Sequence, residues 1–299
     1  MRSDKRIIAA AFIVLLTAPT TRSQDGLALM KVEAGARPSG MAGAFVAVAG
    51  DPNASFYNPA GAAGTDRFTA SFGHNTHWEN IRIETAYFAS NFTGRSWIHG
   101  GIRYAAVNDI ESRLAPTTEP DAYFDAHDIS MKAGLAYRLA ERLAVGAALG
   151  WFIEKIDIYR GSAFNVDLGA LYDVTPELSL GASATNLGSD FSLGISGRPG
   201  TEKVSLPATY RVGAVYRYDR YLGAADLVVL NDQSHLHVGA EGRLHEYLSL
   251  RAGYMFNYDS RNFTAGASFT HRKITVDYAF VPYSNELGTS HLFNLTVTL

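Results

Sequence analysis

Two histidines, His235 and His237, come closest in type and spacing to a chemical site in this sequence. One residue separates them, so on a β-strand both imidazoles point to the same face, where they could ligate a metal ion. No third ligand can be placed beside them, and the chain has no cysteine. The pair is therefore interpreted as polar side chains facing an interior or a loop, and neither a metal nor a cofactor is expected.

A second candidate is the segment Gly194-Ile-Ser-Gly197, whose serine lies near glycines as in the nucleophile elbow of hydrolases. It lacks the strand–turn–helix context that this elbow requires. A hydrolase also needs a serine, a histidine and an orienting polar group close together, and no spacing here fixes such a group. We expect a loop at this segment and no enzymatic activity.

Charged residues of both signs fall at positions predicted to face one interior. An ion-selective constriction would more typically carry one sign, so we expect these side chains to pair, bracing a wall or holding another segment. The predicted luminal residues are Lys132, Asp167, Arg211, Arg217, Glu241, Arg251, Lys273 and Asp277.

The elements that must position these residues are β-strands, because polarity alternates with a period of two from Arg67 to the last residue. In the final segment, Phe293, Leu295, Val297 and Leu299 alternate with polar residues. Such runs predict about fourteen strands, near 67–74, 81–92, 96–107, 127–138, 143–157, 161–172, 178–187, 207–218, 222–230, 233–243, 247–257, 262–270, 273–281 and 291–299.

The connections between these strands tend to alternate between short and long, with long ones expected at 108–126 and 188–206. Transmembrane β-barrels have short turns at one end and longer loops at the other. The pattern of the residues alone leaves a secreted all-β protein open, but this alternation favours an antiparallel membrane barrel.

The N-terminus reads as a targeting segment. Arg2, Lys5 and Arg6 precede about ten apolar residues, a length typical of a signal peptide. We expect a signal peptide over 1–23, with an uncleaved anchor as the alternative, an N-terminal segment over 24–66 and the barrel over 67–299. The net charge of −3 gives no polybasic footprint for nucleic acid.

A Gly-, Ala- and Pro-rich stretch from Glu33 to Gly64 precedes the first strand and contains two turn signals. It resembles the N-terminal segment of the PorV/PorQ-like outer-membrane proteins, relatives of the FadL-type channels. Gly50 and Ala62 depart from the family pattern. The matching positions include Gly35, Arg37, Gly40, Met41, Gly43, Asp51, Asn58, Pro59 and Gly61.

The resemblance implies a barrel of about fourteen strands in the lipid of a Gram-negative-type outer membrane, with this segment as a plug in its lumen. It implies a platform for type IX-like protein secretion or attachment, whose partners are secretion-system proteins and exported cargo. The alternative is a FadL-like channel that takes long-chain fatty acids or other hydrophobic small molecules, and a purely structural barrel also stays open. Plug residues that could line an apolar cavity are Phe45, Val46, Val48, Phe56 and Tyr57.

Overall fold

The computed structural model describes residues 27–65, 67–77, 81–195, 198 and 200–299. The expected signal peptide, 1–23, lies outside the described residues, as do Ser196 and Gly197 of the elbow-like segment. None of the described helices is both long and apolar enough to cross a membrane.

Fourteen antiparallel strands of the described chain form a closed barrel, in which each strand pairs with its neighbours and the last pairs with the first. A short extra strand, β8 (Gly194–Ile195), pairs with the edge of β6. The barrel strands are β1 (Thr69–Thr76), β2 (Arg82–Asn91), β3 (Ser96–Ser112), β4 (Ala122–Ala140), β5 (Leu143–Ile156), β6 (Tyr159–Asp173), β7 (Leu178–Gly188), β9 (Thr209–Tyr218), β10 (Tyr221–Leu230), β11 (Gln233–Arg243), β12 (Leu248–Phe256), β13 (Phe263–His271), β14 (Ile274–Pro282) and β15 (Thr289–Thr298).

The outer face of the barrel wall is apolar and its inner face is polar, the reverse of a water-soluble protein. In β15, Phe293 and Leu295 are 50% and 43% exposed, whereas Asn294 between them is 3% exposed. In β6, Phe164 is exposed while Asp167 is fully buried. Apolar side chains outside and polar ones inside match the predicted alternation and suit a wall that faces lipid.

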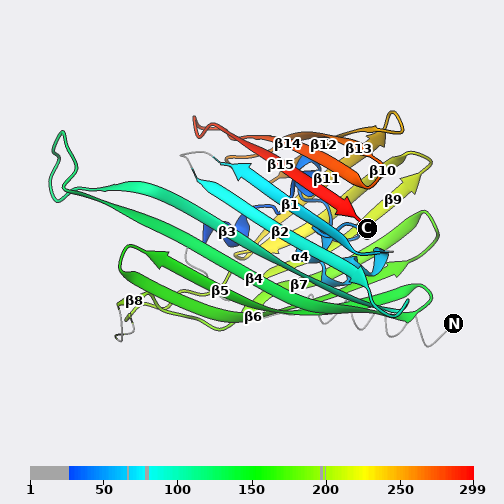
Figure 1. Ribbon diagram of the computed structural model, residues 1–299, viewed down its shortest axis with the longest axis horizontal. Helices are drawn as coiled ribbons and strands as arrows, with labels where there is room; N and C mark the ends of the chain where they lie inside the picture. The colour runs from blue at the N-terminus through cyan, green and yellow to red at the C-terminus, as the bar shows by residue number, and fades with distance from the viewer. Residues whose placement is uncertain (1–26, 66, 78–80, 196–197, 199) are drawn as a thin grey trace.

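One predicted loop is wrong. The segment 108–126 is mostly strand, because β3 continues to Ser112 and β4 begins at Ala122, with a register shift between Val107 and Ile110. The resulting hairpin projects beyond the rest of the barrel (Figure 1). Its residues are largely exposed on both faces, so its sequence lacks the alternation from which a strand is recognised.

The connections distinguish the two ends of the barrel. At the short-turn end lie the connections after β2, β4, β6, β9, β11 and β13, together with the C-terminus. At the long-loop end lie the projecting hairpin and the connection 189–208 between β7 and β9.

Residues 27–65, called the plug below, lie inside the barrel (Figure 1). Glycine and proline divide this segment into short pieces: α2 (Ala28–Lys31), α3 (Ala36–Gly40), α4 (Ala54–Tyr57) and the 3₁₀-helix η1 (Pro59–Gly64). Asn58 caps η1, since its side chain accepts a hydrogen bond from the Ala60 N–H, and Pro59 takes the first helical position.

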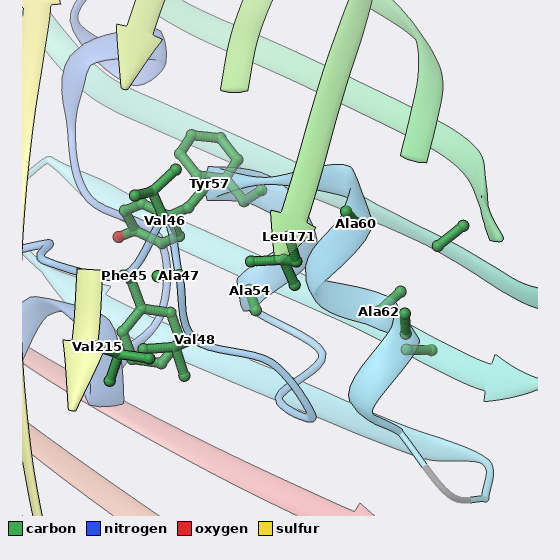
Figure 2. Close-up of a cluster of buried hydrophobic side chains, with 14 of the residues drawn as sticks. Phe45, Val46, Ala47, Val48, Ala54, Tyr57, Ala60, Ala62, Leu171 and Val215 are labelled. Carbon is green, nitrogen blue, oxygen red and sulfur yellow. The ribbon is translucent and has the colours of Figure 1, made fainter. Parts of the chain in front are cut away.

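The barrel has a dry core where the plug meets the wall. Phe45, Val46 and Tyr57 are fully buried against Leu171 of β6 and Val215 of β9 (Figure 2). Burial of an apolar side chain stabilises by about 1.5–3 kcal/mol, so this cluster fixes the plug to the wall.

Glycines in the wall make room for backbone and side-chain atoms of the plug. At six of them, on β5, β6, β7, β9, β11 and β12, an added Cβ would come within 3.0 Å of a plug atom. A glycine inside a strand commonly marks such a close approach of another backbone. This glycine belt consists of Gly146, Gly169, Gly181, Gly213, Gly239 and Gly253.

Candidate functional site

A network of ion pairs joins the plug to the wall near the short-turn end. Arg37 of the plug donates to Glu241 of β11 from Nε and Nη2, at 2.9 and 2.8 Å, and to Asp51 from Nη1 at 3.1 Å. Arg251 of β12 donates to Glu241 at 3.0 Å and to Asp277 of β14 at 2.9 Å. Bidentate and shared contacts of this kind fix geometry strongly, so the network holds α3 against three strands.

Plug backbone groups also have partners in the wall. Asp226 of β10 is fully buried, and its Oδ2 accepts the N–H groups of Phe45 and Val46 at 2.7 and 2.8 Å. Asn58 donates to the carbonyls of Val46 and Ala170, the latter in β6. These bonds satisfy groups that the irregular plug backbone would otherwise bury unpaired.

The plug also spans the junction between the first and last strands. The Ala36 N–H donates to Asn294 Oδ1 of β15 at 2.7 Å, and Asn53 Nδ2 donates to Ser71 Oγ of β1 at 3.4 Å. Asn294 Nδ2 donates to the same Ser71 Oγ at 2.9 Å. The β1–β15 junction is therefore bonded to the plug on both sides.

A bulge interrupts the wall between β6 and β7. Val166 pairs with Leu187 and Leu168 with Ala184, so two residues of β7 face Asp167 alone. One of them, Asn186, has a positive φ of 59°, and its N–H donates to Asp167 Oδ1 at 2.7 Å. Extra residues of this kind bend a strand and re-aim its side chains.

Lys132 of β4 completes this site. Its Nζ donates to Asp167 Oδ2 at 2.5 Å and to Asn186 Oδ1 at 2.8 Å. Lys132 pairs with Gly150 of β5 in the register, and its Nζ reaches across β5 to Asp167 of β6. The ion pair thus anchors the bulge from two strands away.

A cavity of about 990 Å³ opens beside this bulge. Leu149, Trp151 and Phe164 line it from the outer face of the wall, whereas Lys132 and Asn165 line it from the inner face. Because the wall is a single sheet, a cavity lined from both faces lies at an interruption of the sheet. Beyond Thr185 and Thr209 the ladder between β7 and β9 ends, which leaves this lateral cavity open to the outer surface.

An apolar cluster lies behind the lateral cavity at the long-loop end. Leu206, which lines the cavity, belongs to the same cluster as Phe191, Phe152 of β5 and Leu29 of α2. Phe152 and Phe191 have ring centroids 5.9 Å apart. The interior side of the cavity is therefore continuous with apolar side chains of the loop and the plug.

Polar contacts fasten the start of the plug at the long-loop end. Arg261 donates to Glu33 at 2.6 Å. Burial opposes the positive charge of Arg261, but the Glu33 carboxylate together with Tyr258 and Tyr283 outweighs that effect, and the pKa of the guanidinium is raised. Nearby, His77 hydrogen-bonds with Ser290 and packs edge-on against Tyr283. Burial lowers the pKa of His77 to about 4, and the charge of Arg261 acts in the same direction.

The remaining residues that the sequence predicted for a site do not come together in one place. His235 stacks on Tyr258 with centroids 3.9 Å apart, and His237 Nε2 lies 3.1 Å from the Tyr258 hydroxyl. Within the described residues, no three His, Cys, Asp or Glu side chains are arranged to hold a metal ion. Arg211 lies over the Tyr57 ring at 5.4 Å and Arg217 donates to Ser179 at 3.2 Å, both in the lumen. Lys273, in contrast, is exposed in the turn between β13 and β14 and does not face the lumen.

Sequence reasoning missed Asp226 and Asn186. Asp226 carried a usable signal, because it is a lone carboxylate in the apolar run Ala224–Leu230 and falls on the luminal phase of its strand. Asn186 carried none, because the bulge depends on the register between β6 and β7.

Two hollows flank the plug at the short-turn end. One, of about 400 Å³, is lined by Arg37, Glu241 and Arg251 of the ion-pair network, with threonines from β1, β13, β14 and β15. The other, of about 450 Å³, lies against Ala47 and Arg217. Between these hollows and the lateral cavity, the dry core of the plug fills the lumen.

No family model and no curated protein matches the sequence. Solved structures do match. The toluene transporter TbuX of Ralstonia pickettii has a TM-score of 0.66 at 15% identity, with 88% of this chain and 97% of that chain covered. The chain shares the fold of that transporter.

Two further structures have the same fold. The toluene transporter TodX of Pseudomonas putida gives a TM-score of 0.64 at 13% identity, covering 88% of this chain and 96% of that chain. A FadL homologue of Pseudomonas aeruginosa gives 0.59 at 12% identity, covering 94% and 98%. The FadL-related part of the expected resemblance is thus supported at the level of fold. With its apolar outer face, this fold places the chain in the outer membrane of a Gram-negative-type bacterium.

Proposed function

We propose that this barrel is a channel that admits hydrophobic small molecules through its wall. The observation that carries the proposal is the lateral cavity, which joins the outer apolar face to an apolar interior at the β6–β7 bulge. A hydrophobic solute dissolved in the membrane would reach this cavity without crossing the aqueous loops. The solved structures that share the fold include transporters of toluene, which supports the proposal.

The plug gives the channel its gate. Its core side chains are almost fully buried and fill the lumen between the lateral cavity and the short-turn end. A solute that crosses the barrel therefore requires part of the plug to move. The contacts that hold the plug, above all those of Asn58, Asp226 and Arg37, set the free energy of that motion.

The sequence led us to expect a secretion platform first, with the channel for hydrophobic small molecules as the alternative. None of the contacts or cavities described above favours the secretion platform, and none of the reported structures is a secretion protein. A docking platform also has no need for an interrupted wall, whereas a channel for hydrophobic solutes does.

Filling the lateral cavity tests the proposal. Ala208 lines the cavity, and an Ala208→Trp substitution places an indole in it. Ala240 faces outward on β11 and is exposed, so Ala240→Trp is the matched control. Each variant is expressed in a Gram-negative host that lacks its own long-chain fatty-acid channel, and uptake of labelled oleate and labelled toluene is measured.

We expect Ala208→Trp to lose most of the uptake that the wild type confers and Ala240→Trp to retain it, at equal amounts of folded barrel in the outer membrane. Equal uptake in both variants would refute lateral passage. Wild-type uptake no higher than that of the empty host, for both solutes, would refute the channel itself.

A further inference from the structure

A small cavity lies between the plug and the wall, separate from the lateral cavity except for one shared residue, Lys132. Its volume is about 10 Å³, which is room for a single water-sized particle. The plug contributes Ser55 and Phe56 of α4 to its lining, and β2, β3 and β4 contribute Tyr87, His99, Arg103 and Lys132.

Several polar atoms of this cavity have no hydrogen-bond partner among the described residues. They are Nε and Nη1 of Arg103, Nε2 of His99 and the hydroxyl oxygen of Tyr87. The three residues are buried to 95% or more, with exposures of 2%, 3% and 5%. Four atoms unpaired around one cavity is unusual, because buried polar groups are nearly always hydrogen-bonded.

The charge of Arg103 determines which kind of ligand this cavity can hold. Its Nη2 donates to the Val32 carbonyl at 2.9 Å, and its guanidinium lies over the Phe56 ring at 4.5 Å. Among the residues that the structure describes, these contacts leave the charge itself without a carboxylate, and no carboxylate lines the cavity. Lys132 adds a second cation, whose own carboxylate, Asp167, lies outside the lining.

A buried cation without a counter-charge is costly. The unpaired atoms of Arg103 are donors only, and the tyrosine hydroxyl and one tautomer of histidine also donate. A ring of donors around a net positive charge suits an anion. The volume limits that anion to a single atom, since a carboxylate or phosphate has at least three heavy atoms.

We propose that this cavity binds one monatomic anion, chloride under physiological conditions. The ion accepts hydrogen bonds from Arg103, Tyr87 and His99 of the wall while it contacts α4 of the plug. It thereby neutralises the Arg103 charge and joins the plug to β2 and β3, on the side of the barrel opposite the Arg37–Glu241 network. The proposal does not depend on what the channel carries.

Bromide identifies the site directly, because it replaces chloride and has a strong anomalous signal. Crystals of the full chain are grown in sodium bromide, with and without an excess of sodium chloride. We expect an anomalous peak within hydrogen-bond distance of Arg103 Nη1, which the chloride excess removes. A map that shows bromide elsewhere but none at Arg103 would overturn the proposal in favour of a single ordered water.

A matched pair of variants tests the contacts in solution. Tyr87→Phe removes one donor from the cavity and keeps the ring, whereas Tyr104→Phe makes the same change on the outer face of β3, where Tyr104 is 39% exposed. The thermal midpoint is followed as chloride replaces gluconate at constant ionic strength and sodium concentration.

We expect the midpoint of the wild type and of Tyr104→Phe to rise with chloride and to saturate, since a ligand that binds the folded state stabilises it. Tyr87→Phe should need roughly 5- to 10-fold more chloride for half of that rise. This factor corresponds to the free energy of one lost hydrogen bond. An equal response of all three proteins, or none in any of them, would overturn the proposal.

Discussion

Removal of the Asn58 side chain should loosen the plug. Asn58 is fully buried. Its Nδ2 donates to the carbonyls of Val46 and Ala170 at 2.8 and 3.0 Å, and its Oδ1 accepts the Ala60 N–H at 3.0 Å. Asn58→Ala leaves these three backbone groups without this partner. At about 1 kcal/mol for each bond, the docked state of η1 loses about 3 kcal/mol, which is roughly a 100-fold change in the equilibrium for its opening.

Hydrogen exchange measures that equilibrium. The amides of η1 should exchange roughly 100-fold faster in Asn58→Ala than in the wild type, and single-channel recordings should show more time in open states. The control is Asn91→Ala, which removes one exposed contact, between Asn91 Oδ1 and the Gly94 N–H. If exchange in η1 and conductance both match the wild type, Asn58 does not hold the plug, and the argument from its hydrogen bonds is refuted.

Three further predictions concern the same anchors. Arg251→Met should cost about 3–5 kcal/mol because it leaves Asp277 buried without its partner; chemical denaturation measures this cost, and a loss below 1 kcal/mol would contradict it. Gly169→Val should displace Asn58, since even a Cβ at this position overlaps the Asn58 amide; exchange in η1 should rise as in Asn58→Ala, and protection at the wild-type level would count against the glycine belt. Because burial lowers the pKa of His77 to about 4 from 6.5, the unfolded chain binds more protons, and stability present above pH 6.5 should fall by up to about 3 kcal/mol as the pH drops towards 4. His77→Gln should flatten that part of the melting profile, and an unchanged slope would refute the assignment.

The barrel itself could be predicted from the sequence because each membrane-facing strand must alternate. The predicted segments 233–243 and 143–157 agree with β11 and β5 to within a residue. The hairpin of β3 and β4 could not be predicted over its outer part, because beyond the membrane neither face has to be apolar. Alternation therefore reports the part of a strand that lies in lipid and says little about the rest.

The contacts of the site were harder to predict from the sequence than the strands. The sequence places Lys132 and Asp167 in the lumen, but their pairing crosses an intervening strand, β5. The pairing of Arg37 with Glu241 is also not encoded locally, because the two residues are separated by more than 200 positions. Alternation gives the face on which a side chain lies, whereas its partner depends on strand register and on the path of the plug, which no local pattern encodes.

The bonds between the plug and the β1–β15 junction have a consequence for assembly. The plug directly precedes β1, and β15 is the last barrel strand in sequence order, so the barrel closes between its first and last strands. A closed ring cannot easily admit residues 27–65 afterwards. The plug must therefore already lie among the strands when β15 reaches β1, and its bonds to Ser71 and Asn294 offer both edges a common template. The plug of the finished barrel thus also serves as the template around which its wall is closed.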